Sequence, residues 1–182
     1  MALVVRPARP DDAAGIARVH VATWRSTYRG LIPDEYLDNL KEETRAAYWK
    51  DVITRDVGAP DQPFVMVAEK SGRGVVGFAV GGPERRGDPR FKGELGAIYI
   101  LEAHQRQGIG TRLVQAVARE LLQRGCSTML VWVLAKNPCR PFYEALGGRR
   151  IRSETITIGG ATLENWAYGW DDIRGLAAKR DE

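Results

Sequence analysis

Cysteine and histidine are scarce in this sequence. Its 182 residues include two cysteines, Cys126 and Cys139, and two histidines. The cysteines lie thirteen positions apart, which matches no metal-binding spacing, and two histidines are too few for a histidine-rich site. We therefore interpret both cysteines as reduced thiols of a cytoplasmic protein and expect no metal.

Long apolar runs are missing as well. The opening residues, MALVVRPARPDDAAG, contain only four apolar residues, ALVV, between Met1 and Arg6, which is too short a run for the central region of a secretory signal. No stretch approaches the roughly 20 apolar residues that a membrane-spanning helix needs. We expect no membrane association.

The sequence also lacks a strong excess of one charge. A net charge of +4 permits an anionic ligand but does not imply nucleic acid. The arginines are scattered, and no basic stripe is interleaved with aromatic residues. The densest cluster, ERRGDPRFK (84–92), sits among glycine and proline and is predicted to be a solvated loop. We expect no nucleic-acid partner.

Length and hydrophobic periodicity predict a single α/β domain, of the α+β type, spanning residues 1–182. Three- and four-residue steps predict a helix from Pro10 to Tyr28, with His20 on its buried face as a core histidine. Further helices are predicted after Pro33 and over 41–53, 109–124 and 138–146. Strands are predicted within 3–8, 63–82 (two strands joined by KSGRG), 93–101, 127–134, 149–159 and 161–170. This order indicates a mixed sheet with helices on both faces, and the tail 175–182 is expected to fray.

The stretch HQRQGIGTRL (104–113) places two glycines at the start of a helix. A dinucleotide fingerprint needs a third glycine where Leu113 stands, and a P-loop needs a lysine that does not follow these glycines, so both motifs are excluded. The first helical turn leaves its N–H groups unpaired, and glycine removes the Cβ atoms that would keep an anion away. The pattern indicates an anion cradle suited to a pyrophosphate, although a glycine-rich turn without a ligand remains open.

Residues Gln105 to Gly110 match the [Gln/Arg]-x-x-Gly-x-[Gly/Ala] motif, and the chain thereby resembles the GNAT N-acetyltransferase superfamily. The setting strengthens the resemblance, because IYIL precedes the motif, and VWVL and NPCRPFYEALGG follow it. The core of the match covers about 94–148, and the order of strands and helices extends the resemblance to most of the chain. Residues 20–40 resemble a bacterial branch with uncharacterised or polyamine-type members. The resemblance implies a mostly antiparallel mixed sheet of six or seven strands, about four flanking helices, and a splayed parallel pair of central strands.

The resemblance also implies a cofactor, acetyl-CoA, and residues that hold it. Main-chain groups of Ile98 and Ile100 would bind the pantetheine amides. Asn137 would bond a cofactor amide, cap the following helix, or do both. The pyrophosphate cradle would consist of Arg106, Gln107, Gly108, Ile109, Gly110 and Thr111, with added side-chain charge from Arg106 and Arg112 unless these arginines are plain surface.

In such an enzyme an amine attacks the thioester directly, in a ternary complex. Tyr143 is the predicted general acid for the departing thiolate; the alternative is a tyrosine that packs at a helix end. Glu94 is the predicted base, acting directly or through water; the alternative is an exposed acid at a strand end. Trp24, Tyr28 and Glu35 are predicted to line the acceptor pocket, although core packing remains open for Trp24.

Two positions depart from the family pattern. Gly148 stands where the family usually has phenylalanine, and we expect it to reduce apolar packing there. Pro141 falls in the first turn of its helix, where the missing N–H costs little.

The predicted function is transfer of an acetyl group from acetyl-CoA to a primary amine of a small molecule or a peptide. The alternative is a non-catalytic acyl-CoA-binding regulatory module on the same fold. The acceptor stays open, and Asp34, Glu35 and Asp38 could supply acidity for a polycation. The apolar NWAYGW (165–170) is read as either a last core strand or a dimer strand, and we favour a homodimer.

Overall fold

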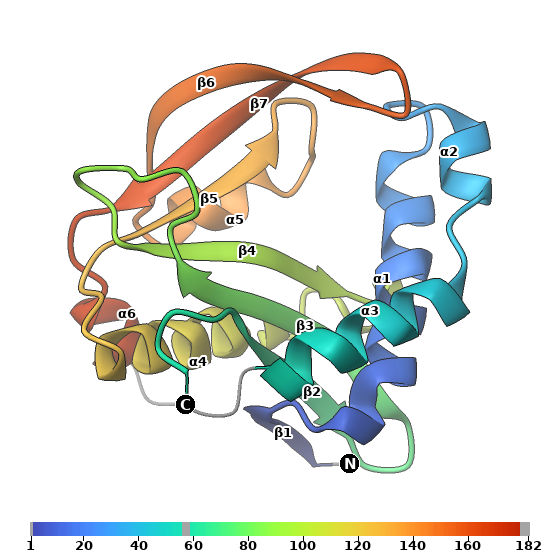
Figure 1. Ribbon diagram of the computed structural model, residues 1–182, viewed down its shortest axis with the longest axis horizontal. Coiled ribbons are helices and arrows are strands. Elements are labelled where there is room, and N and C mark those ends of the chain that lie inside the picture. The colour runs from blue at the N-terminus through green and yellow to red at the C-terminus, as the bar shows by residue number, and fades with distance from the viewer. Residues whose placement is uncertain (1, 56–58, 179–182) are drawn as a thin grey trace.

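The computed structural model describes residues 2–55 and 59–178 and contains one seven-stranded sheet, ordered β1-β2-β3-β4-β5-β7-β6 (Figure 1). The strands are β1 (Leu3–Pro7), β2 (Phe64–Lys70), β3 (Gly74–Pro83), β4 (Gly93–Ile100), β5 (Met129–Leu134), β6 (Arg149–Ile158) and β7 (Ala161–Trp170). Within the described chain β4 and β5 form the one parallel pair, and the other neighbours are antiparallel. The predicted mixed, mostly antiparallel sheet is confirmed.

Helices cover both faces of the sheet, as the sequence predicted. They are α1 (Ala13–Tyr28), α2 (Asp34–Asp38), α3 (Glu42–Arg55), α4 (Ile109–Gln123), α5 (Arg140–Ala145) and α6 (Arg174–Ala178), with short 3-10 turns at Pro10–Asp12 and Glu102–His104. We call the two sides of the sheet the α1 face and the α4 face. The prediction of a frayed tail is wrong up to Ala178, because α6 packs against α4; residues 179–182 lie outside the described residues.

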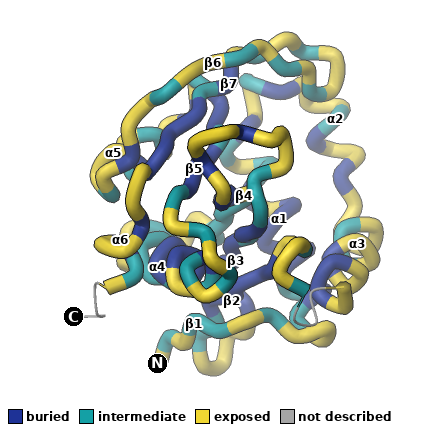
Figure 2. The backbone as a smooth tube through the Cα atoms, turned by 60° about the vertical axis from the view of Figure 1, so that its left-hand side comes forward, coloured by how far each residue is buried: buried dark blue, intermediate teal, exposed yellow. Residues whose placement is uncertain are grey.

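The core lies mainly between α4 and the sheet. Ile109, Leu113, Val117 and Leu121 recur at the spacing of one helical face and are all buried. They pack in one cluster with β2, β3, β4, β5 and β7, and Figure 2 shows how deeply α4 is enclosed. A second cluster joins α1 and α3 to β2 and β3. The start of α4 is therefore held rigidly beside the central strands.

The two central strands separate along their length. Only residues 93–95 of β4 pair with 129–131 of β5, although β4 continues to Ile100 and β5 to Leu134. The separation begins at a β-bulge, because Val80 of β3 faces Ala97 while Gly81 faces Leu95, which leaves Gly96 as the extra residue. A bulge bends its strand and increases the local twist. The predicted splayed parallel pair is confirmed, and Gly96 marks where it opens.

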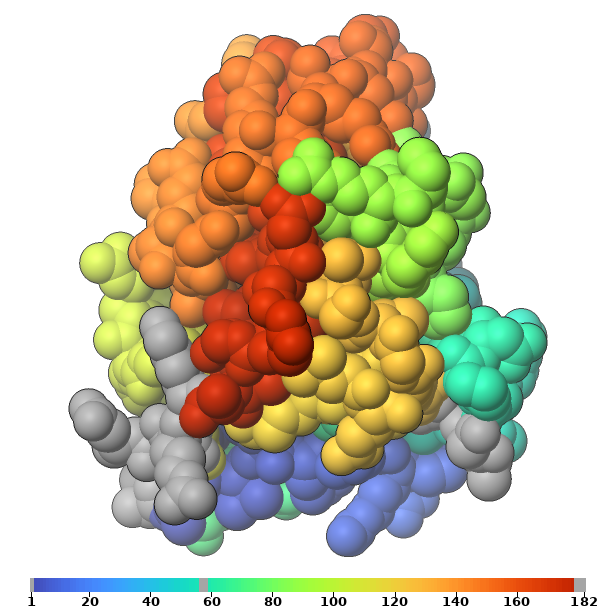
Figure 3. Space-filling view, turned by 90° about the vertical axis from the view of Figure 1, so that its left-hand side faces the viewer, coloured from blue at the N-terminus to red at the C-terminus, as the bar shows by residue number. Residues whose placement is uncertain are grey.

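Strand β7 is an interior strand. Residues 165–170 pair with β5, and 165–169 also pair with β6. Figure 3 shows the chain after β7, in red, lying against the residues that lead from α4 into β5. A strand with neighbours on both sides has no free edge to offer to a second sheet. The dimer-strand reading of NWAYGW is therefore wrong, and the segment is a core strand.

No helix within the described ranges is long and apolar enough to cross a membrane. Both cysteines are unpaired thiols, as predicted: Cys126 is half-buried and Cys139 is exposed.

Candidate active site between strands β4 and β5

Backbone groups of β4 point into the opening between the two strands. The Leu101 N–H donates to the Val76 carbonyl of β3 at 3.0 Å. Because alternate residues of an antiparallel strand bond to the same neighbour, Ile98 and Ile100 turn their N–H and C=O groups away from β3 and toward β5. The Gln105 side-chain amide donates to the Ile100 carbonyl at 3.0 Å, so this carbonyl already has a hydrogen-bond partner. An unpaired buried backbone group costs roughly 1–3 kcal/mol, so the opening favours a ligand with amide groups.

The start of α4 presents unpaired donors beside this opening. The first intrahelical bond runs from the Arg112 N–H to the Gly108 carbonyl, so the N–H groups of residues 109–111 have no partner within the helix. The N-cap residue, Gly108, has no side chain to cap them. Gly108 has φ = 78° and Arg106 has φ = 60°, the left-handed conformation that bends the chain around the helix start. This geometry fits the predicted anion cradle.

The second glycine of the motif has a packing role that the sequence did not reveal. A Cβ atom at Gly110 would lie 3.1 Å from the Phe142 ring, whereas one at Gly108 would meet nothing within 4 Å. Gly110 thus lets α5 approach the start of α4, and Gly108 supplies the left-handed turn. Ile109 is buried in the core, and Thr111 is half-buried.

Basic and amide side chains surround the cradle. Arg106 and Gln107 are exposed, and the Gln107 side chain donates to the Ala103 carbonyl at 3.2 Å. Its oxygen lies 3.5 Å from the Lys70 ammonium, which reaches over from β2. Arg112 lies toward β1, where its guanidinium is 3.3 Å from the Leu3 carbonyl. An anion at the helix start would meet positive charge on this side.

Tyr143 is a buried residue of α5 and lies near Tyr99 of β4. Its ring stacks on Tyr168 at 6.0 Å and contacts Phe142 edge-on at 5.3 Å. Burial raises the pKa of its hydroxyl well above the usual range, and Tyr99 and Cys139 raise that pKa further. The phenol is therefore protonated at neutral pH, which is the form a general acid needs. The ring contacts show the packing role that was the alternative prediction, and the acid role stays a prediction.

Asn137 connects α1 to the turn before α5. Its side-chain oxygen accepts from the Cys139 N–H at 2.8 Å, and its amide donates to the Tyr28 hydroxyl at 3.4 Å. The N-cap of α5 is Cys139 and no side chain caps it, so Asn137 stabilises the turn before α5 and the predicted helix cap is wrong. Burial raises the pKa of Tyr28 far above its usual range, and Tyr99 and Tyr143 add to this effect. Three phenols, from α1, β4 and α5, thus lie near one another at the opening.

Tyr99 was missed by the sequence reasoning. It packs with the α1 cluster, while its neighbours Ile98 and Ile100 pack on the α4 side. Trp24 lies next to it, with ring centres 6.4 Å apart, and 5.1 Å from Tyr28. The sequence Ile98-Tyr99-Ile100 could have indicated this position, because successive side chains of a strand point to opposite faces of the sheet. Trp24 and Tyr28 do gather beside the opening, whereas Glu35 is exposed on α2.

Glu94 is buried, not exposed: it is 3% accessible. The Arg85 side chain donates to both of its oxygens, at 2.6 and 3.1 Å. Glu94 lies on the part of β4 that pairs with β5, opposite Leu130 and two residues before the bulge at Gly96. The alternative prediction, that Glu94 is an exposed acid at a strand end, is wrong. Any proton transfer to Glu94 takes place beside a bound guanidinium.

The loop 84–92 is anchored instead of freely solvated. Arg86 pairs with Glu154 of β6, Asp88 pairs with Arg152 of β6, and Arg90 pairs with Asp171 after β7. Arg86 also lies 4.6 Å above the ring of Trp132. Trp132 projects on the α1 face, because Val131 and Val133 on either side belong to the α4 cluster. The prediction of a solvated loop is confirmed for most of the segment, which is exposed, but Asp88 and Phe91 are buried and the ion pairs fix its course.

The glycine at position 148 does not leave a packing gap. A Cβ atom there would lie 2.6 Å from the Trp170 indole, whose N–H donates to the Leu146 carbonyl at 3.0 Å. Trp170 fills the space, so the expected loss of packing is wrong. Pro141 lies in the first turn of α5, as predicted.

In the part of the chain that the structure describes, no three His, Cys, Asp or Glu side chains are grouped to hold a metal ion.

Comparisons with known proteins agree with this geometry. Residues 21–147 match the model of the acetyltransferase (GNAT) family. The uncharacterized N-acetyltransferase YuaI of Bacillus subtilis is 40% identical over 174 residues, which cover 96% of each chain.

Two solved structures share the fold. That of yncA from Salmonella typhimurium, with its cofactor acetyl-CoA, has a TM-score of 0.69 at 20% identity and covers 93% of this chain and 94% of its own. That of PaiA N-acetyltransferase from Thermoplasma acidophilum, in complex with coenzyme A, has a TM-score of 0.69 at 17% identity and covers 91% and 98%. The chain belongs to the acetyltransferase (GNAT) family.

Proposed function

We propose that this protein transfers the acetyl group of acetyl-CoA to a primary amine, by direct attack in a ternary complex. The observation that carries the proposal is the opening between β4 and β5, where strand amides lie next to the unpaired helix donors of α4. Acetyl-CoA supplies the activated acyl group as a thioester. The residues of the opening have the polarity and the glycine turn that such a molecule requires.

Each part of the opening has one task in this proposal. Residues Arg106 to Thr111 hold the pyrophosphate through main-chain N–H groups. The main-chain groups of Ile98 and Ile100 hold the pantetheine amides, and Asn137 contributes from the other wall. Placing the thioester in a fixed position against the amine removes much of the entropic barrier.

Proton transfers complete the reaction. Tyr143 gives its proton to the departing thiolate, since burial keeps the phenol protonated. Glu94 accepts the proton of the ammonium through water, because Arg85 occupies both of its oxygens. Trp24, Tyr28 and Glu35 face the acceptor. We further propose a cytoplasmic homodimer whose contact surface does not use β7.

A turnover screen tests the function. The purified chain is mixed with acetyl-CoA and polyamines, antibiotics, amino acids or peptides, and both free thiol and acetylated product are measured. We expect equal amounts of thiol and product with at least one class of amine. If the chain binds acetyl-CoA at micromolar concentration but releases no thiol with any amine, the silent acyl-CoA-binding module is the correct function.

Replacement of one hydroxyl tests the proposed acid. Tyr143→Phe should lower kcat by roughly a hundredfold or more, the usual contribution of a general acid, with little change in acetyl-CoA binding. Tyr168→Phe is the matched control, because its ring stacks on Tyr143 and its hydroxyl bonds Glu144 instead. Equal activity of Tyr143→Phe and Tyr168→Phe would remove Tyr143 from the mechanism.

A further inference from the structure

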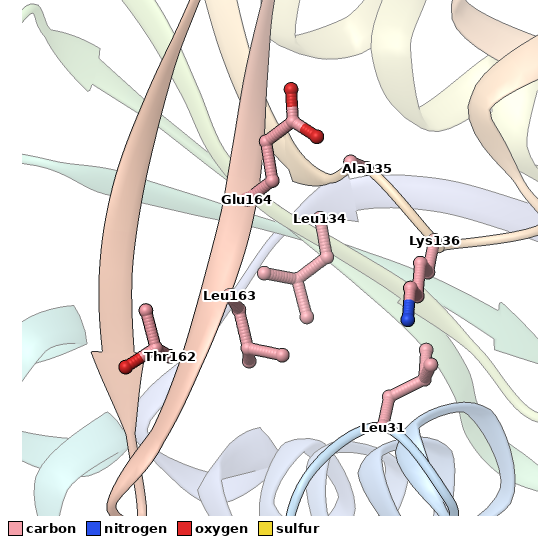
Figure 4. A pocket seen from close by; sticks show the side chains of 7 residues that line it. All are labelled: Leu31, Leu134, Ala135, Lys136, Thr162, Leu163 and Glu164. Atoms are coloured by element: carbon pink, nitrogen blue, oxygen red, sulfur yellow. The ribbon is translucent and has the colours of Figure 1, made fainter.

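A small apolar pocket lies beside the candidate active site. It encloses about 100 Å³ between the turn after α1, the end of β5 and the β6–β7 hairpin. Figure 4 shows the side chains of Leu31, Leu134, Leu163 and Lys136 directed toward a common space, while the Thr162 hydroxyl points away. An apolar cavity of about 150 Å³ holds benzene, so this pocket fits a group of roughly three or four carbon atoms.

The pocket lies beside the apolar cluster that contains Tyr28. Leu134 belongs to the same apolar cluster as Tyr28. Lys136 directly precedes Asn137, whose amide bonds the Tyr28 hydroxyl. A ligand held in the pocket therefore has its other end near the phenols at the opening of β4 and β5.

The pocket carries one uncompensated charge. Its carboxylate, Glu164, accepts from the Trp166 indole at 2.6 Å and lies 3.7 Å from the Arg150 guanidinium. Lys136 is exposed and has no ion pair within the described residues. A lysine ammonium at the mouth of an apolar pocket selects a carboxylate attached to a short hydrocarbon chain.

The nearby acids are poorly placed to attract a polycation. On the α1 face Glu94, Glu154 and Asp88 each have an arginine partner. On α2 the Arg29 guanidinium binds both Asp34 and Asp38. Glu35 is the carboxylate on α2 for which the structure gives no ion pair. A polyamine acceptor would therefore have to bind at Glu35.

We propose that the acceptor is a free α-amino acid with a short aliphatic side chain, bound with its carboxylate at Lys136 and its side chain among the three leucines. This inference rests on the proposed function and specifies its acceptor. The α-amino group is then directed toward the thioester at the strand opening. The same chemistry disfavours a peptide N-terminus, whose first residue has an amide in place of the carboxylate.

Matched acceptors test the role of the carboxylate. Leucine, leucinamide and isoamylamine share the side chain and differ in the group next to the amine. Wild type should favour leucine by roughly tenfold or more in kcat/KM, a typical effect of one charge-assisted contact. Lys136→Met should raise KM for leucine by about this factor and leave leucinamide within about twofold, whereas Lys136→Arg should retain most of the preference.

Two further variants complete the design. Lys41→Met removes an equally exposed lysine between α2 and α3 and should change no KM. Leu163→Phe fills the pocket and should penalise leucine more than alanine, which has no side chain long enough to enter it.

The outcomes separate this inference from the proposed function. Equal use of leucine and leucinamide by wild type, or an equal effect of Lys136→Met on both, overturns the inference alone. Preference for spermidine that is lost in Glu35→Gln also overturns it and leaves the acetyltransferase function intact. Absence of acetylation with every amine, despite acetyl-CoA binding, overturns both.

Discussion

Burial determines the protonation state of His20 on the inner side of α1. The residue is 6% accessible, and the rings of Trp24, Trp49, Phe78 and Tyr99 surround it. The Trp49 indole donates to its Nδ1 at 3.2 Å, and no described residue bonds its Nε2. Burial, helped by the positive charge of Arg45, lowers the pKa of His20 to about 4. The prediction of a core histidine is confirmed.

The buried neutral histidine makes stability depend on pH. In the unfolded chain His20 takes up a proton near its ordinary pKa of about 6.5, but in the folded chain it does so only near pH 4. Between these values the unfolded state binds more protons, so the free energy of unfolding falls as the pH falls, by up to about 3 kcal/mol. Urea unfolding at about pH 7 and about pH 4.5 measures this loss.

His20→Leu supplies the comparison. It removes the titrating group and should shrink the difference in unfolding free energy between the two pH values, whatever its cost at neutral pH. An unchanged difference would mean that other groups cause the acid sensitivity.

Helix α4 has a glycine in the left-handed conformation at each of its two ends. Gly108 at its start has φ = 78°, and Gly125 just after its end has φ = 83°. A Cβ atom at either position would meet nothing within 4 Å. Both positions are therefore sterically open, and only Gly108 belongs to the proposed cradle.

This symmetry yields a controlled test of the cradle. Gly108→Ala and Gly125→Ala should each destabilise the chain by about 1–2 kcal/mol, because both force a left-handed alanine. Only Gly108→Ala should also raise KM for acetyl-CoA, since it disturbs the N–H groups of residues 109–111. Chemical denaturation and saturation kinetics of both variants provide the two readouts, and a parallel rise in KM for Gly125→Ala would argue against a cradle at Gly108.

Local sequence signals predicted most elements but not their irregularities. The glycine motif, the IYIL and VWVL runs and the periodicity of α4 identified the strand, turn and helix around the opening. The bulge at Gly96 was not predictable, because it arises from the pairing of β4 with β3 and leaves no turn residue pattern of its own. The Arg85–Glu94 pair likewise depends on how the 84–92 loop folds back on the sheet. Contacts between segments far apart in the chain set both features.

At the scale of the whole molecule, the sheet consists of two parts with a short connection. Strands β1 to β4 form one part, and β5, β7 and β6 form the other. Residues 93–95 and 129–131 are the backbone pairing that joins them within the described chain. The interior position of β7 could not be derived from its apolar sequence, because a core strand and an interface strand have the same composition.

This division explains how one fold can bind an extended molecule at its centre. Beyond residues 95 and 131 the two strands are not paired with each other, and the unpaired donors at the start of α4 lie beside this opening. A bound acetyl-CoA would complete the hydrogen bonding that β5 does not provide. We therefore expect acetyl-CoA to bind in this opening and on no other surface.

Amide hydrogen exchange with and without acetyl-CoA tests this claim most directly. The amides of Ile98 and Ile100 and those of residues 109–111 should exchange at least about tenfold more slowly when acetyl-CoA is bound. The Leu101 amide, which already donates to Val76 of β3, is the internal control and should change little. Acetyl-CoA binding that leaves the Ile98 and Ile100 amides unprotected, or that protects only residues away from the opening, would mean that the cofactor does not bind between β4 and β5.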